Sequence, residues 1–165
     1  MPVRLALAAD LHRIVAIYNA SIPGRMATAD TDPVTVEARE GWFREFDPGR
    51  RPLWVATDGS DERISGWLSV RSFYGRPAYA ATVELGVYVD PDVRRRGVAS
   101  ELLRHALGAA PALAIRSLLG FVFAHNTPSL ALFGRFGFER WGLLPRVAVL
   151  DGVERDVAIL GLRLP

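Results

Sequence analysis

Apolar and polar residues alternate along residues 82–89, a segment rich in β-branched side chains. This alternation is typical of a β-strand. Asp90-Pro91-Asp92 interrupts the alternation, and apolar residues then recur at helical spacing. The pattern therefore predicts a strand, a short turn and an amphipathic helix that begins within residues 93–100. The apolar stripe of that helix consists of Leu102, Leu103, Ala106 and Leu107.

Two further helices are expected in the first third of the chain. Asp10 suits the N-cap of the first helix, whose inward positions repeat with helical periodicity. Asp32-Pro33 is predicted to open the second, because proline fits the first helical position. That helix should run through Phe46 and end at Asp47-Pro48-Gly49. The inward residues of the first helix are Leu11, Ile14, Val15 and Tyr18.

Strands are predicted at residues 3–7, 53–57 and 64–73. The last two flank Asp58-Gly59-Ser60-Asp61, which is a hairpin signal. Together with residues 82–89 they would give three antiparallel strands in succession. Trp54 and Trp67 are interpreted as packing residues of this sheet.

The second half of the chain is also predicted to contain both helices and strands. Gly108 and Pro111 should end the helix, and residues 117–124 read as a buried strand parallel to the one at residues 82–89. Another helix begins at Thr127-Pro128 and ends at Gly137. Two strands, near residues 138–150 and 154–164, follow it. The fold class is therefore α+β, with a mixed, mostly antiparallel sheet and helices on both faces.

Composition narrows the functional classes. With 165 residues, 50% of them hydrophobic, the chain fits one domain over residues 1–165. It contains no cysteine, which excludes disulfides, thiolate metal sites and a cysteinyl acyl-enzyme. We expect no metal, and any acyl transfer should be direct or use a nucleophile other than cysteine.

All 20 basic residues are arginines, but 18 acidic residues leave a formal charge of only +2. The charges are dispersed, which argues against a nucleic-acid partner and favours a small anionic ligand. The N-terminus lacks the features of a signal peptide, and the apolar run at residues 118–124 is too short to span a bilayer. We therefore expect a soluble cytoplasmic protein without a membrane partner.

The predicted turn has the pattern R-x-x-G-x-A, formed by Arg94, Gly97 and Ala99. Gly97 lets the backbone approach a ligand, and the first N–H groups of a helix have no partner within it. Phosphate is the natural guest of such a site. An ordinary loop with solvated arginines is the alternative.

Following the strand sequence V-Y-V-D-P, this motif is similar to the acetyl-CoA signature of the GNAT N-acetyltransferases. The resemblance extends nearly end to end and is strongest to the branch that contains phosphinothricin and methionine sulfone acetyltransferases. Its other residues are Ile17-Tyr18-Asn19, Trp42-Phe43, Arg76-Pro77-Ala78-Tyr79, Thr82-Val83-Glu84, Asn126-x-x-Ser129, Gly137-Phe138 and Asp156-Val157.

The resemblance implies the GNAT fold and acetyl-CoA as cosubstrate. The pantetheine arm would pair with the backbone of Val87 and Val89, while Asn126 and Ser129 would lie on its other side. Asn126 could equally be a helix cap. The residues expected to hold the pyrophosphate are Arg94, Arg95, Arg96, Gly97, Val98 and Ala99.

Glu84 is the candidate general base. It interrupts an apolar strand, where burial would raise its pKa, and the resembled branch places the proposed base at this Thr-Val-Glu position. The alternatives are an exposed strand carboxylate or a structural partner of Arg76. His125 is the second candidate for the base.

Phe133 departs from the family pattern, which often has tyrosine or histidine there to protonate the leaving thiolate. Phenylalanine cannot donate a proton. Releasing a thiolate of pKa ~8.5 at pH 7 costs only ~2 kcal/mol more than releasing the thiol. Phe133 is therefore compatible with catalysis.

The acceptor is expected to meet two further groups of residues. Arg71, Arg76 and Tyr79 could hold a carboxylate through charge-assisted hydrogen bonds, or be edge charges and packing groups. Met26 and Thr28 lie in a turn-rich loop that covers the acceptor site in the resembled family. That loop could also be passive surface.

These features predict an acetyl-CoA-dependent N-acetyltransferase that acts on the amino group of a small amino-acid-like substrate. Phosphinothricin, methionine sulfone and methionine sulfoximine are the candidate acceptors from the resemblance. A peptide or protein N-terminal acetyltransferase and a non-catalytic acyl-CoA-binding sensor are the alternatives. A homodimer is common in the resembled branch.

Overall fold

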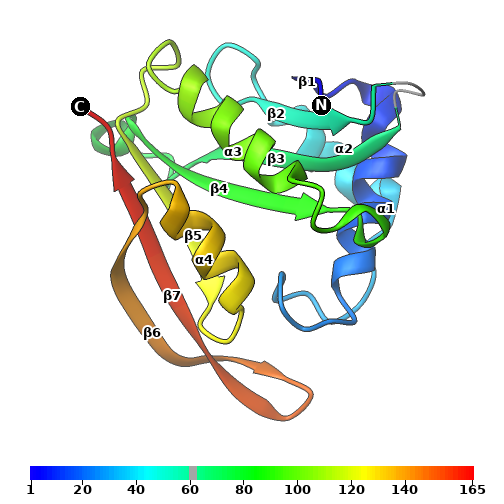
Figure 1. Cartoon of the computed structure of the whole chain (residues 1–165), viewed down its shortest axis with the longest axis vertical. Helices are drawn as coiled ribbons and strands as arrows, with labels where there is room; N and C mark the ends of the chain where they lie inside the picture. Colours follow the sequence, from blue (N-terminus) through cyan, green and yellow to red (C-terminus); the bar gives the residue numbers. More distant parts are fainter. Residues whose placement is uncertain (60–62) are drawn as a thin grey trace.

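The computed structural model describes residues 1–59 and 63–165 and contains a seven-stranded sheet in the order β1-β2-β3-β4-β5-β7-β6 (Figure 1). All neighbouring strands are antiparallel except β4 and β5, which are parallel. This confirms the mixed, mostly antiparallel sheet. The strands are β1 (Val3–Leu5), β2 (Leu53–Thr57), β3 (Ile64–Ser72), β4 (Thr82–Val89), β5 (Ser117–Phe123), β6 (Glu139–Leu150) and β7 (Val153–Arg163).

Helices cover both faces of the sheet, as expected for the α+β class. In Figure 1, α3 and α4 lie in front of the sheet, and α1 and α2 lie behind it. Two buried clusters correspond to these faces: one contains the α3 stripe, and the other contains α1 residues packed against Trp67. The helices are α1 (Leu11–Ser21), α2 (Val36–Arg44), α3 (Val98–Ala109) and α4 (Thr127–Arg135).

The hydrophobic pattern predicted most of the core correctly. Both Trp54 and Trp67 are buried, as are the four inward residues predicted for α1. In the α3 stripe Leu107 is only partly buried, whereas its other three members are inaccessible to solvent. Ser60 and Asp61, which belong to the predicted hairpin turn, lie outside the described residues.

The predicted helix start near residue 32 requires correction, whereas Asp10 does occupy the predicted N-cap position but without a capping hydrogen bond from its side chain. Helix α2 begins at Val36, because the Thr35 hydroxyl accepts from Ala38 N at 3.1 Å and caps it. Pro33 therefore precedes the helix, and α2 ends at Arg44 rather than Phe46. Asp10 occupies the N-cap position of α1, but its carboxylate turns back to Leu7 N, at 2.7 Å, and to Arg4.

The end of α3 and the end of β1 also differ from the prediction. Helix α3 begins at Val98, within the predicted range, since Gly97 has a left-handed backbone with φ of 80° and its carbonyl accepts the first helical bond from Glu101 N. At the other end Gly108 lies inside the helix, because one glycine costs a helix only ~1 kcal/mol. Strand β1 ends at Leu5 instead of residue 7.

The β6–β7 hairpin carries many of the exposed large apolar side chains of the described surface, and the length and polarity of the helices bear on membrane insertion. The β6–β7 hairpin extends beyond the rest of the molecule in Figure 1. Several large apolar side chains on it are exposed: Trp141, Leu143, Leu144, Val147, Val149 and Val153. In the described parts of the chain, every helix is too short or too polar to cross a bilayer.

Candidate active site

The central feature of the site is a split between the two parallel strands. Only Thr82, Val83 and Glu84 of β4 pair with β5, although both strands continue beyond this point. The two strands therefore separate immediately after Glu84. Such a separation leaves backbone groups of the diverging strand ends without a ladder partner.

The direction of the β4 backbone shows which groups face the split. Asp90 N donates to Ser65 O at 2.9 Å, and Phe73 N donates to Thr82 O at 3.3 Å, at the two ends of an unbroken β3–β4 register. Bonded residues alternate along an antiparallel ladder, so even-numbered β4 residues face β3. The backbone groups of Leu85, Val87 and Val89 consequently face the split.

Beyond the split, the turn before α3 forms a basic concave backbone. Arg95 has φ of 65° and Gly97 has φ of 80°, two left-handed positions separated by one residue. Turns of this kind, followed by the unbonded first N–H groups of a helix, suit an anion. A side chain at Gly97 would meet no other heavy atom within 4 Å, so the backbone there is open to a ligand.

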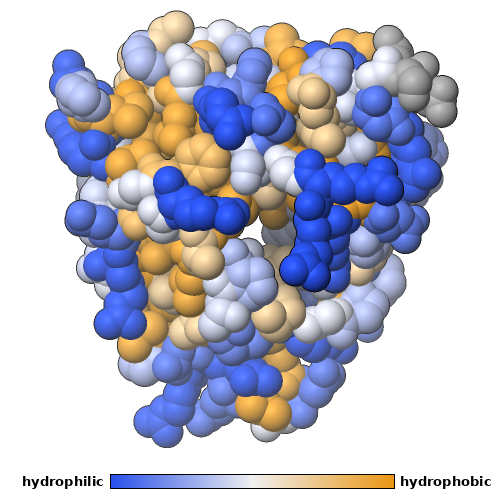
Figure 2. All heavy atoms as spheres, viewed as in Figure 1, coloured by the Kyte–Doolittle hydropathy of each residue, from blue (hydrophilic) through white to orange (hydrophobic). Residues whose placement is uncertain are grey.

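Three arginines surround this concave turn. Arg94, Arg95 and Arg96 are exposed, and none forms an ion pair with a carboxylate in the described part of the chain. Figure 2 shows strongly hydrophilic side chains gathered over the turn, beside a hollow in the same face. Geometry and charge therefore fit the pyrophosphate of acetyl-CoA.

Close packing fixes the start of α3 on the sheet. An ideal Cβ at Gly66 would lie 2.8 Å from Val98 Cγ1 and 2.8 Å from Tyr88 O, so only glycine allows this approach.

Ion pairs fix the end of β4, where Asp90 is buried and ion-paired with Arg13 and Arg63. Although burial opposes it, the hydrogen bond from Asp92 N and these arginines hold the pKa of Asp90 below its usual value. The turn is thus held between a packed helix start and a fixed strand end.

Glu84 lies at the last paired position before the split, on the face covered by α1 and α2. Burial raises the pKa of its carboxyl group, while the charge of Arg71, directly opposite on β3, acts in the other direction. The net effect is upward, as the sequence predicted. A carboxylate with a raised pKa is a better proton acceptor near neutral pH.

The residue that follows Glu84 on the same face is Gly86, and its lack of a side chain lets Ser69 approach. A Cβ at Gly86 would lie 2.8 Å from the hydroxyl of the buried Ser69. The next side chain is Tyr88, whose ring stacks on Trp67 with 4.5 Å between centroids. Glu84, Ser69 and Tyr88 therefore border a place where the strand itself carries no side chain.

A pocket lies at the connection between β3 and β4. Among the residues lining it are Arg50, Arg76 and Tyr79, together with Ser72 and Ala80. The buried Arg51 supports this lining from behind, because it donates to the Ser72 hydroxyl at 2.9 Å and to Ala80 O at 2.7 Å.

The charge of this pocket is positive. Neither Arg50, Arg51 nor Arg76 has a carboxylate partner in the described residues. Burial, and secondarily the charge of Arg50, lowers the pKa of Arg51. The pocket therefore favours an anionic group.

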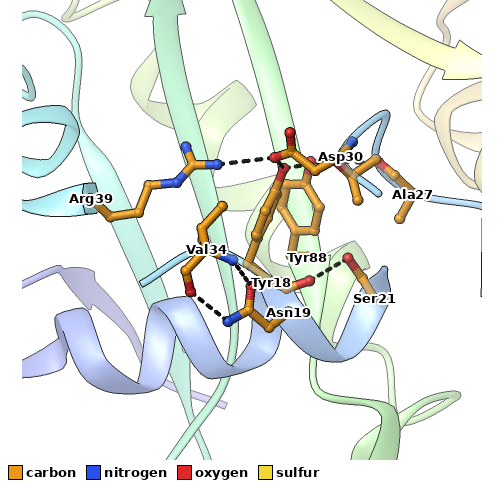
Figure 3. A network of polar contacts seen from close by, with 9 residues as sticks. Tyr18, Asn19, Ser21, Ala27, Asp30, Val34, Arg39 and Tyr88 are labelled. Atoms are coloured by element: carbon orange, nitrogen blue, oxygen red, sulfur yellow. Dashed lines mark hydrogen bonds and ion pairs between the residues drawn. The ribbon is translucent and has the colours of Figure 1, made fainter. Parts of the chain in front are cut away.

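The loop between α1 and α2 contacts Tyr88 near the carboxyl end of β4, on the face of the sheet on which Glu84 also lies, and Figure 3 shows how the loop is held. Tyr18 donates to the Asp30 carboxylate and lies 2.6 Å from the Thr28 hydroxyl. Arg39 binds Asp30 at 3.2 Å and stacks over the Tyr18 ring at 4.8 Å. The buried Thr28 thus faces Tyr18, while the predicted loop residue Met26 is half-buried.

The two tyrosines of this network have raised pKa values. Burial raises the pKa of Tyr88 above its ordinary value, with a further contribution from Tyr18. Burial and the Asp30 carboxylate likewise raise the pKa of Tyr18. The shifts favour the protonated hydroxyls, which donate to Ala27 O and to Asp30.

The opposite side of the split is formed by the start of α4. Asn126 caps this helix, as its Oδ1 accepts from Ser129 N at 3.2 Å. His125 Nε2 lies 2.8 Å from Arg25 O, within the loop between α1 and α2. Phe133 is buried against Phe138 and over Gly120, so its ring is a packing group of α4.

Apart from the loop residues Met26 and Thr28, the predicted site residues fall into three groups. Val87, Val89 and the turn at residues 94–99 lie along or beyond the split, with Asn126 and Ser129 across it. Glu84 and Arg71 lie opposite each other on neighbouring strands, whereas Arg76 and Tyr79 belong to the basic pocket. Sequence reasoning did not single out Tyr88 or Arg51. The strand period places Tyr88 on the face of Glu84, so that signal was present.

Comparison with known proteins agrees with this geometry. The sequence matches the Acetyltransferase (GNAT) family over residues 13–138. It is 50% identical over 164 residues to YwnH of Bacillus subtilis, provisionally named a phosphinothricin acetyltransferase, with 99% of each chain covered. It is also 31% identical over 162 residues to an L-methionine sulfoximine/L-methionine sulfone acetyltransferase of Pseudomonas paraeruginosa, covering 98% of this chain and 94% of that protein.

A solved structure gives the same result for the fold. The phosphinothricin acetyltransferase of Sinorhizobium meliloti in complex with acetyl-CoA superposes with a TM-score of 0.92 at 29% identity, covering 99% of this chain and 88% of that one. The split sheet, the basic turn and the matched sequence agree. The chain belongs to the GNAT family of acetyltransferases.

Proposed function

We propose that this N-acetyltransferase transfers the acetyl group of acetyl-CoA directly to the amino group of a small amino-acid-like acceptor, with Glu84 as general base. The observation that carries the proposal is the position of Glu84. It is a half-buried carboxylate at the last paired residue before the strands separate. A base at this point would lie where an acyl donor in the split and an amine on the α1 side can meet.

The donor would be held mainly by backbone. Acetyl-CoA supplies the acetyl group as a thioester. The unpaired groups of Val87 and Val89 would bond its pantetheine arm as a neighbouring strand does, with Asn126 and Ser129 on the other side. The turn at residues 94–99 would bind the pyrophosphate through N–H groups, with the three exposed arginines adding charge.

The acceptor amine must lose a proton before it can attack. Glu84 would accept that proton, directly or through a water molecule, and its raised pKa favours this role. Phe133 has no proton to offer the leaving thiolate. Departure as thiolate costs only ~2 kcal/mol at pH 7, so a protein donor is unnecessary.

The acceptor class is inferred from the arginines. Arg71 beside Glu84 and the pocket formed with Arg76 and Tyr79 favour an acceptor that carries a carboxylate or another acidic group. Relatives named for phosphinothricin and methionine sulfoximine act on amino acids of this kind. These compounds are therefore the first acceptors to test, with Met26 and Thr28 contributing from the loop.

A panel of amines assayed by release of CoA tests the function. Amino acids should react with higher kcat/KM than their decarboxylated amines, because only the acid can pair with a fixed guanidinium. Preferential turnover of peptides would overturn the proposed acceptor class. Tight acetyl-CoA binding without turnover of any amine would contradict the enzyme and favour an acyl-CoA sensor.

The homodimer expected from the resemblance has a candidate surface on the β6–β7 hairpin. Val147 and Val149 on β6 are 57% and 61% exposed, and large exposed apolar patches often mark interfaces. Light scattering should give twice the chain mass for the wild type and the monomer mass for Val149→Asp. A monomeric wild type would exclude the dimer.

A further inference from the structure

Four consecutive residues of the loop between α1 and α2 are each held by a different side chain. Residues 25–28, here called the strap, offer three backbone carbonyls and one hydroxyl. Arg25 O lies 2.8 Å from His125 Nε2, and Met26 O accepts from Asn126 Nδ2 at 2.9 Å. Ala27 O accepts a longer bond from Tyr88 OH at 3.5 Å, and the Thr28 hydroxyl lies 2.6 Å from Tyr18 OH.

These contacts come from both sides of the split. His125 and Asn126 follow β5 directly, whereas Tyr88 belongs to β4. The strap therefore spans the two strands that diverge after Glu84. Figure 3 shows the β4 side of this arrangement, where Tyr88 lies beside Ala27 and Tyr18.

Asn126 divides its amide between two partners. Its oxygen accepts from Ser129 N and caps α4, while its nitrogen donates to Met26 O in the strap. The side chain is buried, with 8% of the residue exposed. The two functions can thus be separated, because a cap needs only an acceptor and the strap contact needs only a donor.

The partner of His125 fixes its tautomer. A carbonyl oxygen can only accept, so Nε2 must carry the hydrogen that bonds Arg25 O. The other ring nitrogen, Nδ1, is buried and has no hydrogen-bond partner in the described residues. This geometry makes His125 an anchor of the strap and leaves it no accessible lone pair for a general base.

The strap residue Arg25 has an unusual conformation and an additional contact. Its φ is 53°, in the left-handed region that is uncommon for residues other than glycine. Its guanidinium binds Asp151 in the turn of the β6–β7 hairpin, with 3.0 Å between Nε and Oδ2. The surrounding contacts therefore hold a backbone shape that the sequence alone does not favour.

We propose that His125 and Asn126 are positioning residues, which hold the strap across the split and so place the acceptor against Glu84. The proposal rests on the proposed function of this site. It gives Asn126 a role in acceptor geometry, in addition to the donor contact that the family resemblance implies. The two roles predict different kinetic results, because the strap lies on the acceptor side and the split holds the donor.

Asn126→Asp separates these roles. A carboxylate still caps α4 by accepting from Ser129 N, but it cannot donate to Met26 O. We expect kcat/KM for the acceptor to fall ~10-fold, mainly through a higher KM, as is usual for a lost bond that leaves a partly buried carbonyl unpaired. Acetyl-CoA affinity measured by calorimetry should fall less than the acceptor kcat/KM, because the backbone donor groups of β4 and of the turn at residues 94–99 are unchanged and only the proposed pantetheine contact of Asn126 is altered.

His125 provides a matched pair of variants. Glutamine can place an N–H near the position of Nε2, whereas leucine fills the space without a donor. We expect His125→Gln to retain most of the wild-type acceptor KM and His125→Leu to raise it several-fold, about the value of one hydrogen bond. Equal KM values for the two variants would remove the hydrogen bond from the argument.

Hydrogen exchange tests the strap without reference to turnover. In Asn126→Asp the amides of Arg25 and Asp30, which donate to Ile22 O and to the Thr28 hydroxyl, should exchange faster than in the wild type, while those of α3 stay unchanged and show that the fold is intact. Unchanged exchange of these two amides would overturn the proposal. So would a variant with weaker acetyl-CoA binding and unaltered acceptor KM, which would assign the amide to the donor. If the wild type acetylates no amine, the proposed function fails and exchange still decides whether Asn126 holds the strap.

Discussion

The two sides of β4 differ in how they are built. Toward the split, β4 and the turn after it present backbone N–H and C=O groups of Val87, Val89 and residues 94–99. Toward α1, the strand presents the side chains of Glu84 and Tyr88, with Arg71 of the neighbouring strand beside them. In the proposed reaction the same eight-residue strand would therefore hold the donor with its main chain and face the acceptor with its side chains.

This difference follows from the pleat of the strand. Side chains alternate between faces, while the backbone groups that miss a ladder partner lie in the plane of the sheet. A donor that is the same in every reaction can rely on backbone groups, which depend little on side-chain identity. An acceptor that varies between relatives needs side chains, which mutation can change individually.

The strongest test of the contrast removes the base alone. Glu84→Gln keeps the size of the side chain but not its basicity, so kcat should fall ~10²-fold or more. Acetyl-CoA affinity should stay near the wild-type value. Steady-state kinetics with the best acceptor and calorimetry with acetyl-CoA measure the two effects.

The loss in Glu84→Gln should shrink as pH rises, since more of the free amine is then already neutral. Glu139→Gln, a change at an exposed strand carboxylate, is the control and should leave kcat unaltered. A Glu84→Gln enzyme with wild-type kcat at pH 7 would remove Glu84 from the mechanism.

A change at the proposed acetyl-CoA site should do the opposite of Glu84→Gln: it should lower acetyl-CoA affinity and leave kcat nearly unchanged. At Gly97 a leucine side chain would enter the ligand space or force the backbone out of its left-handed conformation, which costs ~1–2 kcal/mol. We expect acetyl-CoA affinity to fall tenfold or more, while kcat at saturating donor changes little.

Gly108→Leu is the matched control for Gly97→Leu. Gly108 also has open space around it, but it lies near the far end of the same helix with ordinary helical φ. Calorimetry should therefore show unchanged acetyl-CoA affinity for Gly108→Leu. Unchanged affinity in a folded Gly97→Leu protein would refute the assignment of the turn.

Sequence reasoning was more successful on the donor side for a physical reason. The motif at residues 94–99 and the strand before it are contiguous, so local pattern and resemblance predicted them together. The observed helix start at Val98 lies within the predicted range of residues 93–100. The sequence could not narrow that range, because the left-handed backbone at Arg95 precedes the helix and an arginine gives no local signal for that conformation.

The acceptor side depends on contacts between distant residues. Asn126 and Met26 are 100 positions apart, as are His125 and Arg25. No periodicity could predict which carbonyl each side chain would meet. The upward pKa shift of Glu84 was predictable, because its cause is burial within an apolar strand.

The pocket arginine should affect only acceptors that carry an acid group. Arg76→Leu removes a charge-assisted partner, so kcat/KM for an amino acid should fall about tenfold. The decarboxylated amine should react as it does with the wild type. Competition between the two acceptors in one reaction measures the ratio directly, and equal losses for both would show that Arg76 does not recognise the carboxylate.

The smallest effect is expected from Arg71, and it concerns pH rather than maximal rate. Glu84 must be ionised to accept a proton, so activity falls as pH drops through its raised pKa. Arg71 holds that pKa down against the effect of burial. Arg71→Gln should therefore move the acid limb of the kcat/KM pH profile to higher pH and lower the rate on that limb by ~2–5-fold, the range for one exposed charge.

The comparison needs an acceptor without a carboxylate, so that lost substrate binding does not add to the change. Arg76→Gln does not perturb Glu84 and should leave the limb in place. If both variants shifted it equally, the effect would come from the general charge of the site and not from the cross-strand position of Arg71.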